Sequence, residues 1–119
     1  MAVTVQQPHA LKAVELLQRR YFSLVGNPEK LKVRVLETPK GKQLAVMLTN
    51  EKMTTMTEPV YSASLPVTKY HKRRYAEDEL RNSNLNFQGS RLGNLEAADC
   101  RVFPGQAEFD QFVDWYQSL

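Results

Sequence analysis

Apolar residues recur at spacings of three and four near both ends of the chain, which predicts a helix at each end. The first covers residues 9–25, where the apolar stripe consists of Ala10, Val14, Leu17, Tyr21, Leu24 and Val25. Pro8 suits the start of this helix, and Gly26 suits its end. The second covers residues 106–118, where the stripe consists of Phe109, Phe112, Val113 and Tyr116, with Trp115 beside it.

Between these helices the apolar period changes to two, which predicts strands. Leu31–Glu37 alternates between apolar and basic residues, so one face of this strand is expected to be buried. The turn residues at 38–41, with Pro39 and Gly41, predict a hairpin. The returning strand, Gln43–Thr49, is nearly all apolar and is therefore expected to be central, with both faces covered.

The patterns in the second half of the chain are weaker. Residues 53–65 predict a third strand, in which Pro59 requires an edge, a bulge or a break. Residues 67–81 are compatible with a helix, although their apolar periodicity is poor. Turn residues surround one short strand near Leu85–Gln88, and Arg101–Phe103 predicts another.

Grouped strands between two terminal helices are typical of the α+β class. We expect a single small domain over residues 1–119: an antiparallel sheet of about three to five strands, with the N-terminal and C-terminal helices packed on one face. With 42% hydrophobic residues the chain is too apolar for a disordered protein. No apolar run approaches the roughly 20 residues that span a bilayer, so no membrane contact is expected.

The formal net charge of +3 conceals an uneven distribution of charge. Residues 1–91 hold fifteen Lys and Arg against eight Asp and Glu, whereas residues 92–119 hold one against five. The excess of basic residues over residues 1–91 can attract a polyanion to one face of the protein. The acidic end of the chain can also shield that face within the molecule.

The residues that carry most enzyme chemistry are scarce. Cys100 is the only cysteine, which excludes an intrachain disulfide and fits a reducing compartment, so a cytoplasmic location is expected. His9 and His71 are the only histidines, too few for a structural zinc site. The chain has no phosphate-binding glycine loop and no nucleophile elbow. We therefore expect no catalytic residue, metal or cofactor.

The densest chemical feature lies at residues 69–75, where cations alternate with rings: Lys69, Tyr70, His71, Lys72, Arg73, Arg74 and Tyr75. Cations neutralise phosphates, and aromatic faces stack on unpaired bases, so this segment is a candidate surface for nucleic acid or an acidic protein. The alternative is a solvated helix face, in which Arg73 pairs with Glu77 and Arg74 pairs with Asp78 four residues on.

A second basic group surrounds the predicted hairpin and comprises Lys32, Arg34, Lys40 and Lys42. Lys32 and Arg34 are expected on the outer face of one strand, and Lys40 and Lys42 at the hairpin tip. This group extends the candidate surface, although exposed cations on strands also guard a sheet against aggregation.

These features favour a small binding or adaptor protein whose basic surface contacts nucleic acid or an acidic protein, with self-association left open. One alternative is a chaperone-like or inhibitor-like interaction module that uses the acidic terminal helix, Trp115 and a sheet edge near Pro59. Another is a metal-independent ribonuclease, in which His71 or Tyr70 moves a proton and neighbouring cations stabilise the phosphate.

Overall fold

A computed structural model describes residues 5–26, 32–59, 70–81, 85, 90–93 and 96–119. Its elements are α1 (Pro8–Arg19), β1 (Ser23–Val25), β2 (Val33–Glu37), β3 (Gln43–Met47), β4 (Met53–Thr57), β5 (His71–Tyr75), β6 (Ala98–Phe103) and α3 (Gln106–Tyr116). The strands form one antiparallel sheet in the order β1-β2-β3-β4-β6-β5. The α+β prediction is confirmed, with six strands in place of the expected three to five.

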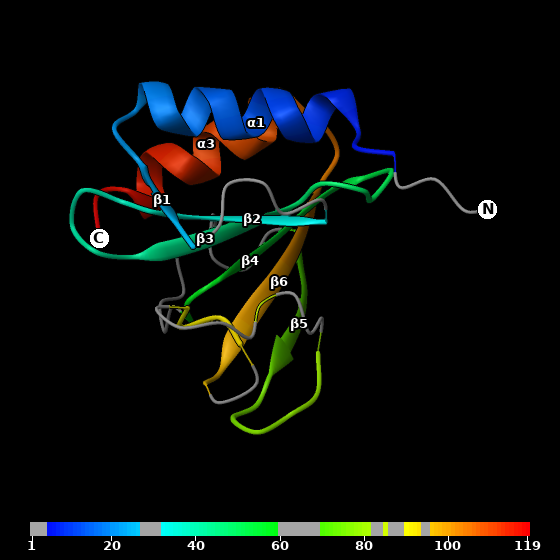
Figure 1. Ribbon diagram of the computed structural model, residues 1–119, viewed down its shortest axis with the longest axis vertical. Helices are drawn as coiled ribbons and strands as arrows, with labels where there is room; N and C mark the ends of the chain where they lie inside the picture. Colours follow the sequence, from blue (N-terminus) through cyan, green and yellow to red (C-terminus); the bar gives the residue numbers. More distant parts are fainter. Residues whose placement is uncertain (1–4, 27–31, 60–69, 82–84, 86–89, 94–95) are drawn as a thin grey trace.

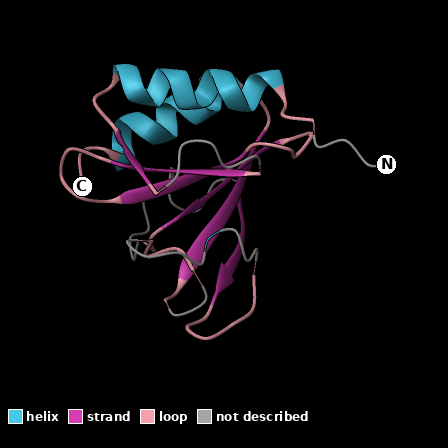
Figure 2. Cartoon of the chain, in the orientation of Figure 1, coloured by secondary structure: helices cyan, strands magenta, loops and turns pink. Residues whose placement is uncertain are grey.

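Both helices cover the same face of this sheet, as predicted (Figures 1 and 2). The stripe of α3 is buried as expected, and α1 buries Ala10, Ala13, Val14 and Leu17 against it and the strands. Phe103 at the end of β6 contacts the rings of Phe109 and Phe112 at centroid distances of 5.6 and 5.4 Å. Trp115 is partly covered, as its place beside the stripe predicts.

A second apolar cluster lies on the opposite face of the sheet. Its buried members are Val33, Val35, Ala45, Met47, Met56, Leu85, Leu92 and Ala98. Every residue of β3 is consequently buried, which confirms that this strand is central with both faces covered. Leu85 contributes to this cluster and does not lie in a strand, while residues 86–88 of the predicted short strand lie outside the described residues.

The predicted helix over residues 9–25 is wrong in its second half, because the chain turns at Tyr21. The amide N–H of Phe22 donates to the Leu17 carbonyl and that of Tyr21 to the Gln18 carbonyl. These bonds form a Schellman motif, which ends α1 at Arg19. Phe22 then packs in the core, Tyr21 is 83% exposed, and residues 23–25 form β1.

The strands are also shorter or longer than their patterns suggest. β4 ends at Thr57, so Pro59 lies beyond a break, and residues 60–65 of the predicted strand lie outside the described part of the chain. Leu31 is likewise outside it, whereas β6 begins three residues before the predicted Arg101. The hairpin is confirmed, and Gly41 adopts the positive φ (93°) that its turn requires.

The helix considered for residues 67–81 is wrong over its described part, because residues 71–75 form strand β5. The expected helical ion pairs therefore do not form: Arg73 pairs with Glu79 and Arg74 with Asp99. β5 pairs antiparallel with β6, with a register irregularity between His71 and Arg73. The charged segment thus becomes a sheet margin, and Figure 1 places it away from the helices.

Candidate functional site

The candidate site is the margin of the sheet formed by β5. Within the described ranges β5 hydrogen-bonds to β6 alone, so its other edge presents main-chain N–H and C=O groups. Residues 71–74 of this strand are exposed, and all four carry basic side chains or imidazole. We refer to residues 71–75 with this outer main chain as the β5 edge.

One side of the β5 edge is anchored to a buried carboxylate, that of Asp99 on β6. Arg74 lies opposite Asp99 in the register and donates from Nε to Oδ1 (2.6 Å) and from one Nη to Oδ2 (2.8 Å). His71 Nε2 lies 3.2 Å from Oδ1, and Arg101 donates to Oδ2 over 3.5 Å. We call these four residues the Asp99 cluster.

The Asp99 cluster keeps its carboxylate ionised. Burial raises the pKa of Asp99, but hydrogen bonds from Arg74 and His71 and the charges of Arg101 and Arg74 oppose it, so the pKa lies below its ordinary value. Among the described residues, one carboxylate therefore faces two arginines.

Arg101 connects the Asp99 cluster to the helix-bearing side of the protein. Its side chain is fully buried, donates to Thr57 Oγ1 over 2.8 Å and lies over the ring of Phe112, 4.8 Å from its centroid. Burial lowers the pKa of Arg101, while the charge of Asp99 opposes that shift. Thr57 of β4 and Phe112 of α3 thus position Arg101 beside Asp99 on β6. Asp99 in turn orients Arg74 and His71 of β5.

The other side of the β5 edge is organised around Tyr75. Arg73 lies over the Tyr75 ring at 4.4 Å from its centroid, and Arg81 does so at 5.1 Å. Glu79 pairs with Arg73 and also accepts a hydrogen bond from the Ala76 amide over 2.8 Å. Lys72 is exposed and forms no ion pair with any carboxylate in the described part of the chain.

The remaining predicted residues of the 69–75 segment are placed differently. Tyr70 turns away from the exposed cations and packs against Phe103, with ring centroids 5.5 Å apart. Its carbonyl accepts from the Val102 amide over 3.1 Å. Lys69 lies outside the described residues. The side chains of Tyr70 and His71 therefore have different surroundings, Tyr70 beside Phe103 and His71 beside Asp99.

The second basic group does not adjoin the β5 edge. β4 and β6 separate β3 from β5, and three strand spacings amount to about 14 Å. Arg34 also does not lie on a free outer face, because its register partner Val46 faces the helix-side core. Lys40 Nζ donates to the Ser118 carbonyl over 2.9 Å, so the hairpin tip contacts the end of the chain. Lys32 is exposed, and Lys42 is half-buried.

β4, which ends just before Pro59, lies between β3 and β6, and among the described strands the margins of the sheet are β1 and β5. The residues after Pro59 lie outside the described part of the chain, so the interaction edge near Pro59 stays a prediction. The acidic end of the chain shields basic residues only in part: Asp114 of α3 pairs with Arg20, and Asp99 of β6 holds Arg74. Asp110 bonds to Gln106 within α3.

Sequence reasoning missed Asp99, Arg101 and Thr57. Asp99 and Arg101 stand two residues apart on β6, beside the apolar Phe103 on the same face of the sheet. That spacing was the available signal, since an acid and a base at i and i+2 on a strand share one face. Only the register with β5 brings Arg74 and His71 to them.

A second charged cluster, at the same end of β4 as Asp99, joins that strand to the helix side. Arg91 donates to Glu58 from Nε (3.2 Å) and from an Nη (3.0 Å), and Glu58 also accepts from the Gln43 amide (2.6 Å). The Tyr116 hydroxyl donates to the Gln43 carbonyl (2.5 Å) and accepts from the Glu58 amide (3.2 Å). Burial, followed by the charge of Glu58, raises the pKa of Tyr116. We call these four residues the Glu58 cluster.

Comparison with protein-family models, curated proteins and solved structures gave no match to this chain. Among the described residues, no three His, Cys, Asp or Glu side chains converge as metal ligands would. None of the helices in these residues combines the length and the apolar character needed to cross a membrane. The functional argument therefore rests on the β5 edge itself.

Proposed function

We propose that this protein is a binding protein whose β5 edge captures an acidic, extended segment of a partner protein. The observation that carries the proposal is the coincidence of two properties in one strand: β5 is a margin of the sheet, and residues 71–74 expose basic groups along it. A segment that adds as a further strand satisfies the outer main-chain groups and places its carboxylates beside these cations.

The main chain supplies the affinity in this proposal, and the charges supply the selectivity. Exposed sheet margins pair readily with other chains, and cations together with bulges limit such pairing. β5 has both devices, because its register shifts between His71 and Arg73 and its side chains are basic. A neutral or basic segment would leave these cations uncompensated, whereas an acidic segment turns the same feature into an attraction.

Lys72 and the Asp99 cluster are the groups that meet the acidic segment. Lys72 has no carboxylate partner among the described residues, and the cluster holds two arginines for one carboxylate. Arg74 and His71 remain 37% and 30% exposed at their side chains, so a second carboxylate can reach them. The partner therefore needs at least two acidic residues, one for Lys72 and one for the Asp99 cluster.

Nucleic acid is the less favoured partner because the main-chain groups at the outer edge of β5 have no counterpart along a phosphate backbone. The free thiol of Cys100 supports the reducing, cytoplasmic location that we propose for this interaction.

Fluorescence anisotropy with a labelled peptide of alternating Glu and Val tests the proposal. We expect saturable binding that Lys72→Glu weakens about tenfold and that Lys12→Glu, an equal charge change on the exposed face of α1, leaves unchanged. A peptide of the same sequence with alternate N-methylated residues keeps the charges and removes main-chain donors. It should bind much more weakly than the parent peptide.

Two outcomes would overturn the proposal. Equal binding of the N-methylated and parent peptides would reduce the contact to charge attraction without strand addition. Tighter binding of a single-stranded RNA of equal charge, with a steep loss of affinity as salt rises and sensitivity to Lys72→Glu, would assign the β5 edge to nucleic acid.

A further inference from the structure

The basic side chains of β5 divide between the two faces of the sheet. His71 Nε2 and Arg74 Nε both lie near the Asp99 carboxylate, at 3.2 and 2.6 Å from Oδ1. Asp99 stands four residues before Phe103 on β6, so the two side chains share a face, and Phe103 packs in the helix-side core. His71 and Arg74 therefore belong to the face that the helices cover.

Arg73 and Lys72 belong to the opposite face. Arg73 is paired with Cys100 in the register and lies over the Tyr75 ring, 4.4 Å from its centroid. Cys100 and Tyr75 both pack against the second apolar cluster, on the face without helices. Lys72 stands at the register irregularity beside Arg73. Burial raises the pKa of the Cys100 thiol, and the nearby charges that oppose this shift include Lys72, which places its ammonium group on the same face.

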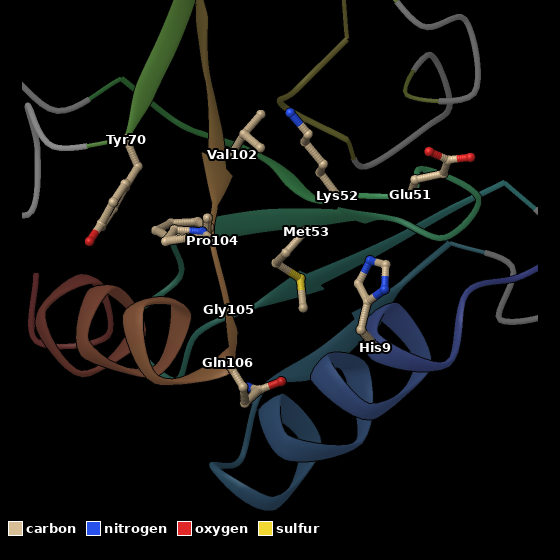
Figure 3. A pocket seen from close by; sticks show the side chains of 10 residues that line it. His9, Glu51, Lys52, Met53, Tyr70, Val102, Pro104, Gly105 and Gln106 are labelled. Carbon is tan, nitrogen blue, oxygen red and sulfur yellow. The ribbon is translucent and has the colours of Figure 1, made fainter.

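The chain itself limits the length of the β5 edge. Before the strand, Tyr70 leaves the extended conformation with a φ of 65°, and its ring lines an open pocket beside Phe103 on the helix side (Figure 3). After the strand, the Ala76 amide is already engaged, because it donates to Glu79 over 2.8 Å. A bound strand therefore meets the cations only within residues 71–75.

We infer that the acidic segment bound by the β5 edge carries two consecutive acidic residues, one for each face of the sheet. Neighbouring residues of a strand point to opposite faces. The first carboxylate reaches Arg74 and His71, and that of the next residue reaches Lys72. This inference rests on the proposed function, because it requires that the segment adds as a strand.

Consecutive acidic residues suit this edge better than alternate ones. Acidic residues two positions apart share one face and leave the cations of the other face without a carboxylate from the partner. On the helix-bearing face the described residues provide two arginines that share Asp99, so a single further carboxylate is sufficient there. The second carboxylate is therefore more useful beside Lys72, which forms no ion pair in the described part of the chain.

Two labelled peptides of identical composition test this inference. The adjacent peptide is acetyl-Thr-Val-Thr-Glu-Glu-Thr-Val-Thr-amide, and the alternate peptide is acetyl-Thr-Val-Glu-Thr-Glu-Thr-Val-Thr-amide. They have the same charge and differ only in the spacing of the glutamates. We expect fluorescence anisotropy to give about fivefold tighter binding of the adjacent peptide, because one more carboxylate meets a partly exposed cation.

NMR of the complexes shows which faces the glutamates contact. The adjacent peptide should shift the side-chain signals of His71 and Lys72 together, whereas the alternate peptide should shift those of one face only. Lys72→Gln should reduce the ratio of the two affinities to about one. Lys12→Gln, which removes an exposed cation of α1, is the matched control and should keep the fivefold ratio.

The outcomes separate this inference from the proposed function. Equal or tighter binding of the alternate peptide by the unmodified protein would overturn the inference and leave strand addition standing. A fivefold ratio that persists in Lys72→Gln would also overturn it, because the second carboxylate would then lie elsewhere. If neither peptide binds saturably, the proposed function fails and the inference fails with it. The comparison of the two peptides needs no variant, so a folding defect in Lys72→Gln does not affect it.

Discussion

The two charged clusters use similar side chains for different purposes. In the Glu58 cluster one carboxylate meets one arginine, Arg91, and a tyrosine hydroxyl and main-chain groups complete the bonding. In the Asp99 cluster one carboxylate meets two arginines and an imidazole. Counted over the described residues, the first cluster is balanced in charge, whereas the second has two arginines for one carboxylate.

Their positions in the sheet sharpen this difference. The Glu58 cluster joins β3, β4 and α3, so it ties together elements that the apolar core already holds. The Asp99 cluster lies between β6 and the marginal strand β5, where Arg74 and His71 reach solvent. A cluster that joins elements of the core stabilises the fold, and a cluster of two arginines at a sheet margin is suited to receive a carboxylate from elsewhere.

The largest expected effect follows from neutralising Asp99. Asp99→Asn keeps the shape of the side chain but leaves the fully buried Arg101 without its carboxylate, and the loss of one partner of a buried pair costs about 3–5 kcal/mol. Glu58→Gln should cost about half as much, because Glu58 and Arg91 are both partly exposed. Urea unfolding followed by circular dichroism measures both.

An equal loss of stability in these two variants would contradict the contrast between the clusters. A useful control is Glu15→Gln, which disrupts the exposed Glu15–Arg19 pair on α1 and should change the free energy of unfolding by less than about 0.5 kcal/mol.

Acid should weaken the Asp99 cluster. The pKa of Asp99 is lower in the folded protein than in the unfolded chain, where it is about 3.9. Its ionised form therefore stabilises the fold above that pH, and the contribution is lost as the pH falls through the folded-state value. The difference in free energy of unfolding between the unmodified protein and Asp99→Asn should decrease as the pH falls from about 6 to about 2. A difference that stays constant over this range would contradict the role assigned to the Asp99 charge.

The Glu58 cluster is tested through Tyr116. Tyr116→Phe removes the donor to the Gln43 carbonyl and the acceptor for the Glu58 amide, so it should destabilise the fold by about 1–3 kcal/mol. Because this cluster does not serve the β5 edge, the variant should bind the acidic peptide with unchanged affinity under folding conditions. Weaker peptide binding by the folded variant would show that the two clusters are coupled.

The smallest effect concerns the end of α1. Tyr21 adopts a positive φ of 67° at the position where a Schellman motif usually has glycine. Tyr21→Gly should raise the free energy of unfolding by up to about 1 kcal/mol, because it removes the steric cost of the left-handed conformation. Thermal unfolding measures this change, and Tyr21→Val, with a β-branched side chain, should lower the melting temperature instead.

Periodicity predicted the parts of the fold in which one face of an element is apolar. The stripe of α3, the stripe of α1 up to Leu17, and the alternation in β2 all report contact with the apolar core. β1 was missed because a tyrosine, Tyr21, occupies the left-handed position that ends α1. Glycine is the residue type expected just after the end of a helix, so the sequence pattern predicted a helix that ends before Gly26.

β5 was missed because its inward face meets charges. Arg74 and His71 bond to a buried carboxylate, so the strand has no apolar alternation for a pattern to detect. The partners of this site lie 25 and 28 residues apart in the chain, and only the sheet register brings them together. The basic residues of this segment could be recognised in the sequence. Their position at a margin of the sheet could be seen only in the structure.

Amide hydrogen exchange on the complex with the alternating acidic peptide tests the central claim most directly. If the peptide adds as a strand, exchange should slow at those β5 amides that do not face β6, and amides of β1, the other margin, should be unaffected. The account predicts this protection together with its loss in Lys72→Glu. Peptide binding that leaves every β5 amide exchanging at its free rate would contradict it.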